Sequence, residues 1–309
     1  MRYLDVRLRV VGDELLSPPR ALLASRMQLK RAFAVYHGPR PQRSNLRALL
    51  DTLHLFLTTH PTETLILSIK EEIPPFHPHF SCRIYEAFKP YLSRWFLEER
   101  IPTLGEVRGR GILLTRFERQ DEDEWPEGMG IHPSTWPDSR REGFEWVCGG
   151  TRVRTQDWYV HCSSIIYTVS LMERRYRVKT FLEIPEKFDT VSHHWSADVM
   201  ELNEGKIVKH LIPTISSTKY PNPFTLSYTS ASYFPLSLPT IIAKGFGWPD
   251  YGLGVYGINT RLMRWILERL ASGEKVRGCC IMDFYRQTGA TERDGEGLAE
   301  VLVMMNFLD

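Results

Sequence analysis

Two short segments near the start of the chain carry residue types that could act on a phosphate diester. Residues 2–7 alternate as in a β-strand, which places Asp5 and Arg7 on one face and apolar side chains on the other. Residues 33–37 form an apolar run that ends at His37, just before a Gly-Pro pair. A guanidinium can bind phosphate oxygens and a histidine can protonate a leaving oxygen, so together they suit phosphodiester cleavage.

The elements that must position these residues alternate along the chain. Buried-type apolar runs predict strands at residues 3–10, 33–37, 64–70, 111–116, 226–232 and 276–284. Apolar stripes at helical spacing predict helices at residues 44–60 (with Ser44 as N-cap), 80–96, 261–271 and 298–305. This alternation favours an α/β parallel architecture, whose closed form is a (β/α) barrel. Catalytic residues of such barrels gather at strand ends, where the sequence places Arg7, His37, Lys70, Arg116 and Asp283.

Three stretches depart from the alternation. Residues 16–31 interrupt what should be a short connection, residues 118–150 are acidic and then rich in Trp, Pro and Gly, and residues 192–217 show no period. The middle stretch is typical of a long loop. We expect the other two to be insertions, with an imperfect gene model as the favoured explanation and lineage-specific loops as the alternative.

Composition narrows the class of protein. The chain has 309 residues, 42% hydrophobic content and a net charge of +2, so it can bury a large core but gives no case for nucleic acid as a partner. The five cysteines are odd in number and include no CxxC pair, which argues against a disulfide framework and a zinc site. No apolar run approaches the roughly 18 residues of a transmembrane helix.

A series of motifs in order along the chain resembles the X domain of bacterial-type phosphatidylinositol-specific phospholipase C. The blocks are Arg-Tyr-Leu-Asp-Val-Arg at 2–7, Tyr-His-Gly-Pro at 36–39, Glu-Thr-Leu-Ile-Leu-Ser-Ile-Lys-Glu-Glu at 63–72, Pro-Thr-Leu-Gly-Glu-Val-Arg-Gly at 102–109, Ile-Leu-Leu-Thr-Arg at 112–116, Gln-Asp-Trp-Tyr at 156–159, and Val-Arg-Gly with Ile-Met-Asp-Phe at 276–284. The resemblance implies a single catalytic domain over residues 1–309 with a distorted, incompletely closed TIM-type barrel. It also implies attack of the inositol 2-hydroxyl on the adjacent phosphodiester, which gives inositol 1,2-cyclic phosphate and diacylglycerol.

The resemblance assigns a role to each matching residue. His37 matches the general acid, Arg7 the phosphate-binding arginine and Asp5 a supporting carboxylate, while Asp283 matches the aspartate that orients the general-base histidine. The positions that hold the inositol ring are Lys70, Arg116, Asp157 and Tyr159. Calcium-dependent relatives carry carboxylate ligands where this chain has Arg7 and Lys70, so we expect catalysis without a metal ion or other cofactor.

The chain departs from the family pattern at its start. The family's general-base histidine lies on a strand before the Arg-Tyr-Leu-Asp block, whereas this sequence begins at Met1. We therefore expect a barrel that is incomplete at its N-terminus. As written the chain predicts a cytoplasmic protein, and a missing N-terminal segment would leave secretion open. The expected partner is phosphatidylinositol or a related lipid headgroup at a membrane surface, bound peripherally by a monomer.

Two other functions stay open on the sequence. The first is a catalytically impaired member that binds inositol lipid headgroups, which the unmatched base favours. The second is a glycerophosphodiester phosphodiesterase on a related barrel. That enzyme would need metal-binding carboxylates at the positions of Arg7 and Lys70. Sensitivity of the activity to a chelator would therefore separate it from a metal-independent phospholipase C.

Overall fold

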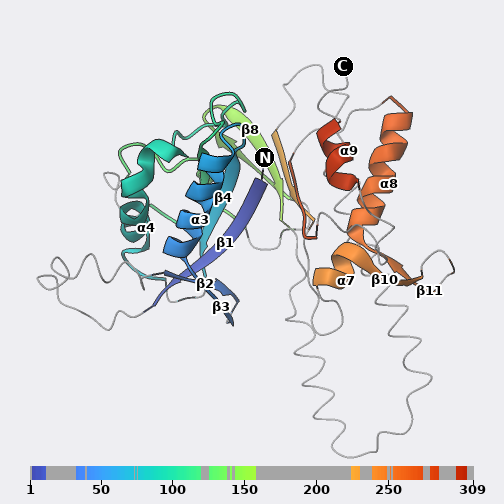
Figure 1. The fold of residues 1–309 in the computed structure, drawn as a ribbon, viewed down its shortest axis with the longest axis horizontal. Coiled ribbons are helices and arrows are strands. Elements are labelled where there is room, and N and C mark those ends of the chain that lie inside the picture. Colours follow the sequence, from blue (N-terminus) through green and yellow to red (C-terminus); the bar gives the residue numbers. More distant parts are fainter. Residues whose placement is uncertain are drawn as a thin grey trace, which may run out of the picture. The chain divides into compact units, whose positions relative to one another are not determined.

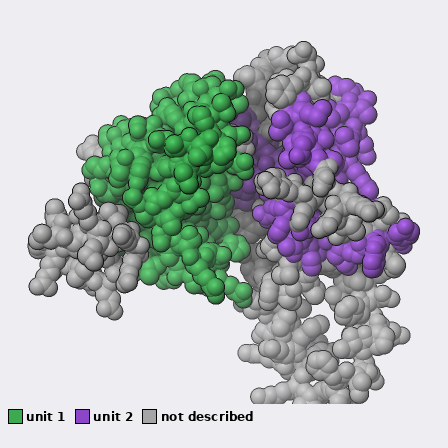
Figure 2. Space-filling view, in the orientation of Figure 1, with its two compact units in different colours: residues 1–136, 146–151 green, residues 137–145, 152–309 purple. Residues whose placement is uncertain are grey.

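The computed structural model describes residues 2–11, 33–38, 40–72, 74, 76–119, 125–137, 140, 143–157, 224–229, 239–248, 251, 253–273, 279–284 and 297–304. The expected insertions at 16–31 and 192–217 lie outside these residues. The chain divides into two compact units, Met1–Trp136 with Trp146–Thr151, and Pro137–Glu145 with Arg152–Asp309 (Figure 2). The single catalytic domain inferred from the resemblance stays a prediction.

The first unit is built on a six-stranded sheet (Figure 1). Its strands are β1 (Arg2–Val10), β2 (Phe33–His37), β3 (Arg40–Asn45), β4 (Leu65–Glu71), β5 (Trp95–Phe96) and β6 (Gly111–Thr115), in the order β3-β2-β1-β4-β6-β5. Strands β1, β4, β6 and β5 run parallel, whereas β2 runs antiparallel to both β1 and β3. The predicted strands at 3–10, 33–37, 64–70 and 111–116 are confirmed to within about one residue.

Two helices and a 3-10 helix accompany this sheet: α3 (Leu46–Thr59), α4 (Phe80–Phe88) and η1 (Lys89–Arg94). Helix α3 runs alongside β1 and β4 (Figure 1). Its buried stripe joins a core with the apolar face of the strands; the members on α3, β1 and β4 are Leu46, Leu50, Leu53, Leu57, Val6, Leu8, Leu65, Leu67 and Ile69. Burial of this face leaves the opposite face of β1 and β4 for polar side chains.

Two predicted helix boundaries in this unit are wrong, one because of the N-cap residue and one because of a proline. The N-cap of α3 is Asn45, whose side chain accepts a hydrogen bond from the Ala48 N–H at 2.9 Å, so Ser44 is not the cap. The helix predicted over 80–96 ends at Phe88 and continues as η1 and then β5. Pro90 explains the break, because proline has no N–H to continue the α-helical ladder.

The second sheet has four strands, β7 (Phe144–Cys148), β8 (Thr151–Gln156), β9 (Phe224–Tyr228) and β12 (Cys279–Ile281), in the order β12-β9-β8-β7. Strands β8, β9 and β12 are parallel. The long loop predicted over 118–150 was wrong at its end, because β7 lies within it. Phe144, Trp146 and Cys148 of β7 are buried and alternate with exposed residues, as expected for a strand with one face in a core.

The remaining elements of the second unit are α7 (Pro239–Lys244), the hairpin of β10 (Gly245–Trp248) and β11 (Leu253–Tyr256), α8 (Ile258–Ala271) and α9 (Leu298–Met304). Helices α7, α8 and α9 share a small apolar core of Ile242, Ile258, Leu262, Trp265, Ile266 and Leu298. The described strands form open sheets rather than a closed barrel. Within the same part of the chain, no helix has the length and apolar character needed to cross a membrane.

Candidate functional site

The parallel register of the first sheet brings three predicted site residues onto one face. Arg7 of β1 is the Cα partner of Lys70 on β4, and Asp5 is the partner of Ser68. Because side chains alternate along a strand, these residues project from the face opposite the apolar core. Arg116 follows β6 directly, and its backbone N–H donates to the Ile69 carbonyl at 2.8 Å.

Asp5 is the centre of an ion-pair network on this face. Its Oδ1 accepts hydrogen bonds from Ser68 Oγ at 2.8 Å and from Arg116 Nη1 at 3.0 Å. Its Oδ2 lies 3.6 Å from Nε of Arg7. One carboxylate therefore holds two guanidinium groups, of which Arg116 is almost wholly buried, with a side chain only 3% exposed.

Glu72 holds the other side of Arg7. Its Oε1 lies 3.4 Å from Arg7 Nη1 and accepts a hydrogen bond from the Gly38 N–H at 2.8 Å. The backbone N–H of Glu72 donates to the Leu8 carbonyl at 2.8 Å. Glu72 was not among the residues predicted from the sequence, although the alternation of Ser68 and Lys70 continues to it and places it on the same face.

The charge of Arg7 is stabilised by this arrangement. Burial by itself favours the neutral form, but the Asp5 and Glu72 carboxylates outweigh both burial and the repulsion from Arg116, so the pKa of Arg7 is raised. The carboxylates contact Nε and Nη1 of the guanidinium. Its Nη2 amine is not part of either contact and can donate to an anionic ligand.

Trp136 is a second residue that sequence analysis did not assign to the site. Its ring lies under the Arg116 guanidinium, with the guanidinium carbon 4.1 Å from the ring centroid. Such stacking helps to fix the orientation of the guanidinium, because the cation is attracted to the face of the ring.

His37 ends β2 and is exposed. In the described part of the chain its side chain makes no hydrogen bond or ion pair, so its position depends on the backbone around it. The next residue, Gly38, has φ +57°, a conformation that favours glycine and turns the chain into β3. The structure thus joins His37 to the network through Gly38 and Glu72.

The other predicted residues belong to the second unit. Asp157 follows β8 and is buried, and Asp283 follows β12. Because β8 and β12 run in the same direction on either side of β9, both aspartates lie at the same edge of that sheet. The Asp283 carbonyl accepts a hydrogen bond from Asn259 Nδ2 at 2.9 Å. Tyr159 lies outside the described residues.

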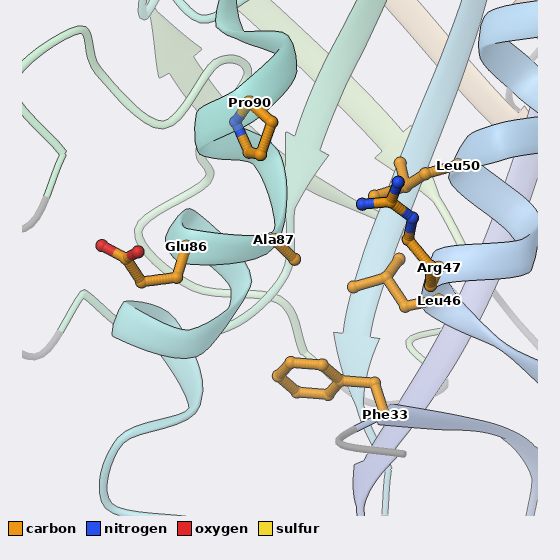
Figure 3. A pocket seen from close by; sticks show the side chains of 7 residues that line it. All are labelled: Phe33, Leu46, Arg47, Leu50, Glu86, Ala87 and Pro90. Atoms are coloured by element: carbon orange, nitrogen blue, oxygen red, sulfur yellow. The ribbon is translucent and has the colours of Figure 1, made fainter. Parts of the chain in front are cut away.

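A pocket in the first unit lies apart from this network. Figure 3 shows Leu46 and Leu50 of α3 facing Ala87 of α4 and Pro90 of η1 across it. The full lining is Phe33, Leu46, Arg47, Leu50, Glu86, Ala87 and Pro90. It includes none of the residues that the sequence predicts for catalysis, so the candidate site rests on the ion-pair network.

No protein-family model matches the chain. A curated relative, the 1-phosphatidylinositol phosphodiesterase of Listeria monocytogenes, is 33% identical over 87 residues, which is 26% of this chain and 27% of that relative. The match thus spans about a quarter of the relative's length.

Solved structures of phosphatidylinositol-specific phospholipase C from Staphylococcus aureus share the fold. One, from work on modulation of membrane binding, has a TM-score of 0.59 at 17% identity and covers 97% of this chain and 78% of that chain. Another, with pentafluoro-Phe incorporated, has a TM-score of 0.57 at 17% identity with the same coverage. The predicted α/β fold, a distorted TIM-type barrel, is therefore confirmed. The chain is similar to bacterial phosphatidylinositol-specific phospholipase C, in sequence over a segment and in fold over nearly its whole length.

Proposed function

We propose that the chain is a phosphatidylinositol-specific phospholipase C-like phosphodiesterase that works without a metal ion. The observation that carries the proposal is the pair of carboxylates around Arg7, which holds a cation on the sheet face beside Lys70 and Arg116. Three cationic and two anionic side chains leave one net positive charge there. That charge complements a phosphate diester, which is a monoanion.

His37 and Arg7 of the first unit take different roles in the proposed reaction. The inositol 2-hydroxyl loses its proton to a base, and its oxygen bonds to phosphorus as the bond from phosphorus to the glycerol oxygen breaks. His37 gives a proton to that glycerol oxygen, which releases diacylglycerol and leaves inositol 1,2-cyclic phosphate. Arg7 stabilises the charge on the non-bridging oxygens. The resemblance assigns no residue of this sequence to the base.

Binding of the headgroup falls to the other assigned residues. Within the first unit, Lys70 and Arg116 are proposed to donate hydrogen bonds to ring hydroxyls. The family resemblance also assigns ring binding to Asp157 and Tyr159, by a hydrogen bond and by stacking. Asp283 matches the aspartate that orients the general-base histidine in the family. Since phosphatidylinositol is a membrane lipid, the protein would act peripherally at a membrane surface.

The side chains present favour catalysis without metal. A hard cation such as Ca²⁺ takes six to eight oxygen ligands, roughly. Both oxygens of Asp5 and Oε1 of Glu72 already contact guanidinium, hydroxyl or backbone donors. Arg7 and Lys70 would in addition repel a divalent cation.

Phosphorus NMR tests the proposal directly. The purified chain is incubated with phosphatidylinositol in mixed micelles in the presence of EDTA, with His37→Ala as the comparison. We expect the resonance of a five-membered cyclic phosphodiester from the unmodified chain and its loss in H37A. Absence of product from the unmodified chain would contradict the proposed activity. A requirement for added Ca²⁺ would contradict metal independence.

A further inference from the structure

Glu72 contacts both segments that carry the proposed catalytic groups of the first unit. One oxygen, Oε1, accepts the Gly38 N–H at 2.8 Å and lies 3.4 Å from Arg7 Nη1. The Glu72 backbone N–H donates to Leu8 on the same strand as Arg7. The carboxylate is nearly buried, with a side chain 8% exposed, so water competes little for these contacts.

We propose that Glu72 is a positioning residue, which sets the turn that carries His37 relative to the guanidinium of Arg7. The inference rests on the proposed function, in which His37 protonates the leaving oxygen and Arg7 binds the phosphate. A general acid must lie within hydrogen-bond reach of the oxygen that it protonates, so the distance between the two groups matters.

The backbone around His37 shows why the turn needs this anchor. The ladder between β1 and β2 reaches Arg7 and Tyr36, and His37 and Gly38 lie beyond that pair. A Cβ placed on Gly38 would meet no atom within 4 Å, so packing does not hold the turn at this point. The pairing of His37 with Arg40 closes the hairpin onto itself but does not tie it to β4. The hydrogen bond from the Gly38 N–H to the carboxylate of Glu72, the residue that follows β4, makes this connection.

A structural ion pair alone would behave differently from a positioning residue. Loss of a purely structural contact lowers turnover of every substrate by the same factor. Loss of the hydrogen bond that holds the His37 turn instead lowers kcat/KM most for substrates whose leaving group needs protonation. The leaving group of phosphatidylinositol is the diacylglycerol alkoxide, which needs a proton from the acid. The leaving group of 4-nitrophenyl myo-inositol 1-phosphate is the stable 4-nitrophenolate, which does not.

Two substitutions separate the two contacts of Glu72. Glu72→Ala removes both the acceptor for Gly38 and the charge beside Arg7. In Glu72→Gln the amide oxygen can still accept from Gly38, but the negative charge is gone. Glu71→Gln is the matched control, because Glu71 binds the His77 N–H at 2.7 Å and contacts none of the proposed catalytic residues.

We expect kcat/KM of E72A to fall about 100-fold on phosphatidylinositol and only about tenfold on the nitrophenyl substrate, within the usual range for a general acid. E72Q should lose activity on both substrates by the same factor, and E71Q should match the unmodified chain on both. An equal loss on the two substrates in E72A would overturn the proposal. If E72A does not fold, Glu72→Asp replaces it, since the shorter side chain cannot reach both partners.

A measurement without turnover keeps the inference separate from the proposed function. If the unmodified chain cleaves neither substrate, the proposed function fails, and amide hydrogen exchange at Gly38 still tests the anchor. We expect the Gly38 N–H to exchange faster in E72A than in the unmodified chain and in E71Q. Unchanged exchange at Gly38 would show that Glu72 does not hold the turn.

Discussion

Arg116 donates from Nη1 to Oδ1 of Asp5 at 3.0 Å, although Asp5 lies on β1 and Arg116 follows β6, with β4 between these two strands. Ser68, on the intervening strand, donates to the same oxygen at 2.8 Å. The contact therefore links β1, β4 and the end of β6 on the polar face of the sheet. This one carboxylate both stabilises the first unit and sets the direction of two cations.

Asp5→Asn should destabilise the protein more than an ordinary surface change. The amide keeps the shape but removes the charge that Arg7 and Arg116 share, and the Arg116 side chain is nearly buried. We expect the free energy of unfolding to fall by about 2–3 kcal/mol, as for hydrogen bonds to charged groups. Denaturant titration followed by circular dichroism measures the loss. Asp51→Asn, which breaks an exposed pair with Arg47, is the control and should cost less than about 1 kcal/mol; similar losses in both would contradict the reading.

Arg7→Lys should reduce turnover without creating a requirement for a metal ion. Lysine keeps the charge but cannot contact both flanking carboxylates and the substrate with a planar fork. We expect kcat/KM for phosphatidylinositol to fall by about 10²–10³, the size of losing one donor to a developing anion. Arg9→Lys, an exposed change on the same strand, is the control and should stay close to the unmodified chain. Activity of R7K within about threefold of the control would remove Arg7 from its proposed role.

Trp136→Leu should weaken headgroup binding through Arg116. Leucine fills space but cannot stack on the guanidinium, whereas Trp136→Phe keeps a smaller ring. We expect the dissociation constant for myo-inositol, measured by calorimetry, to rise by about 3–10-fold in W136L and by less in W136F, in keeping with a cation–π contact of ~1 kcal/mol. Trp248→Leu removes an exposed tryptophan of the second unit and serves as the comparison. A larger effect in W136F than in W136L would contradict the stacking argument.

The strands that were predicted correctly are those whose burial leaves an apolar run or an alternation in the local sequence. Strands β4 and β6 were found because every residue from Leu65 to Ile69 and from Gly111 to Thr115 is buried, which gives mostly apolar runs. The common face of Asp5 and Arg7 followed from alternation alone. Strand β7 also alternates, but its five residues follow a stretch rich in turn formers and were read as loop.

The contacts of Glu72 and Trp136 could not be predicted from the sequence, because their partners are distant along the chain. The Glu72 contacts with Gly38 and Arg7 span 34 and 65 residues, and only the sheet register brings them together. Pro90 is a local signal for the break between α4 and η1, but the apolar spacing that continues past it favoured one helix over 80–96. The chemical roles of His37, Lys70, Asp157, Tyr159 and Asp283 stay predictions.

His54 gives a prediction about pH that is independent of catalysis. Its Nε2 accepts a hydrogen bond from the buried Trp95 indole at 3.0 Å, so the folded protein holds this imidazole neutral. Burial lowers the pKa of His54, helped by Arg94 and opposed by Asp51. The unfolded chain therefore binds the proton more readily. The stabilisation from neutral His54 is complete above the unfolded-state histidine pKa of about 6.5, and it is lost as the pH falls from that value through the lower pKa of the folded state.

We accordingly expect the free energy of unfolding to decrease as the pH is lowered from about 7.5 to 5.5, and His54→Gln should flatten this slope. Glutamine can still accept from the Trp95 indole but does not titrate. Burial also lowers the pKa of His132, so part of the slope should remain in H54Q. His60→Gln, a change at an exposed histidine, is the control. Denaturant titrations at several pH values give the slopes, and an H54Q slope equal to that of the unmodified chain would show that Trp95 does not depend on a neutral His54.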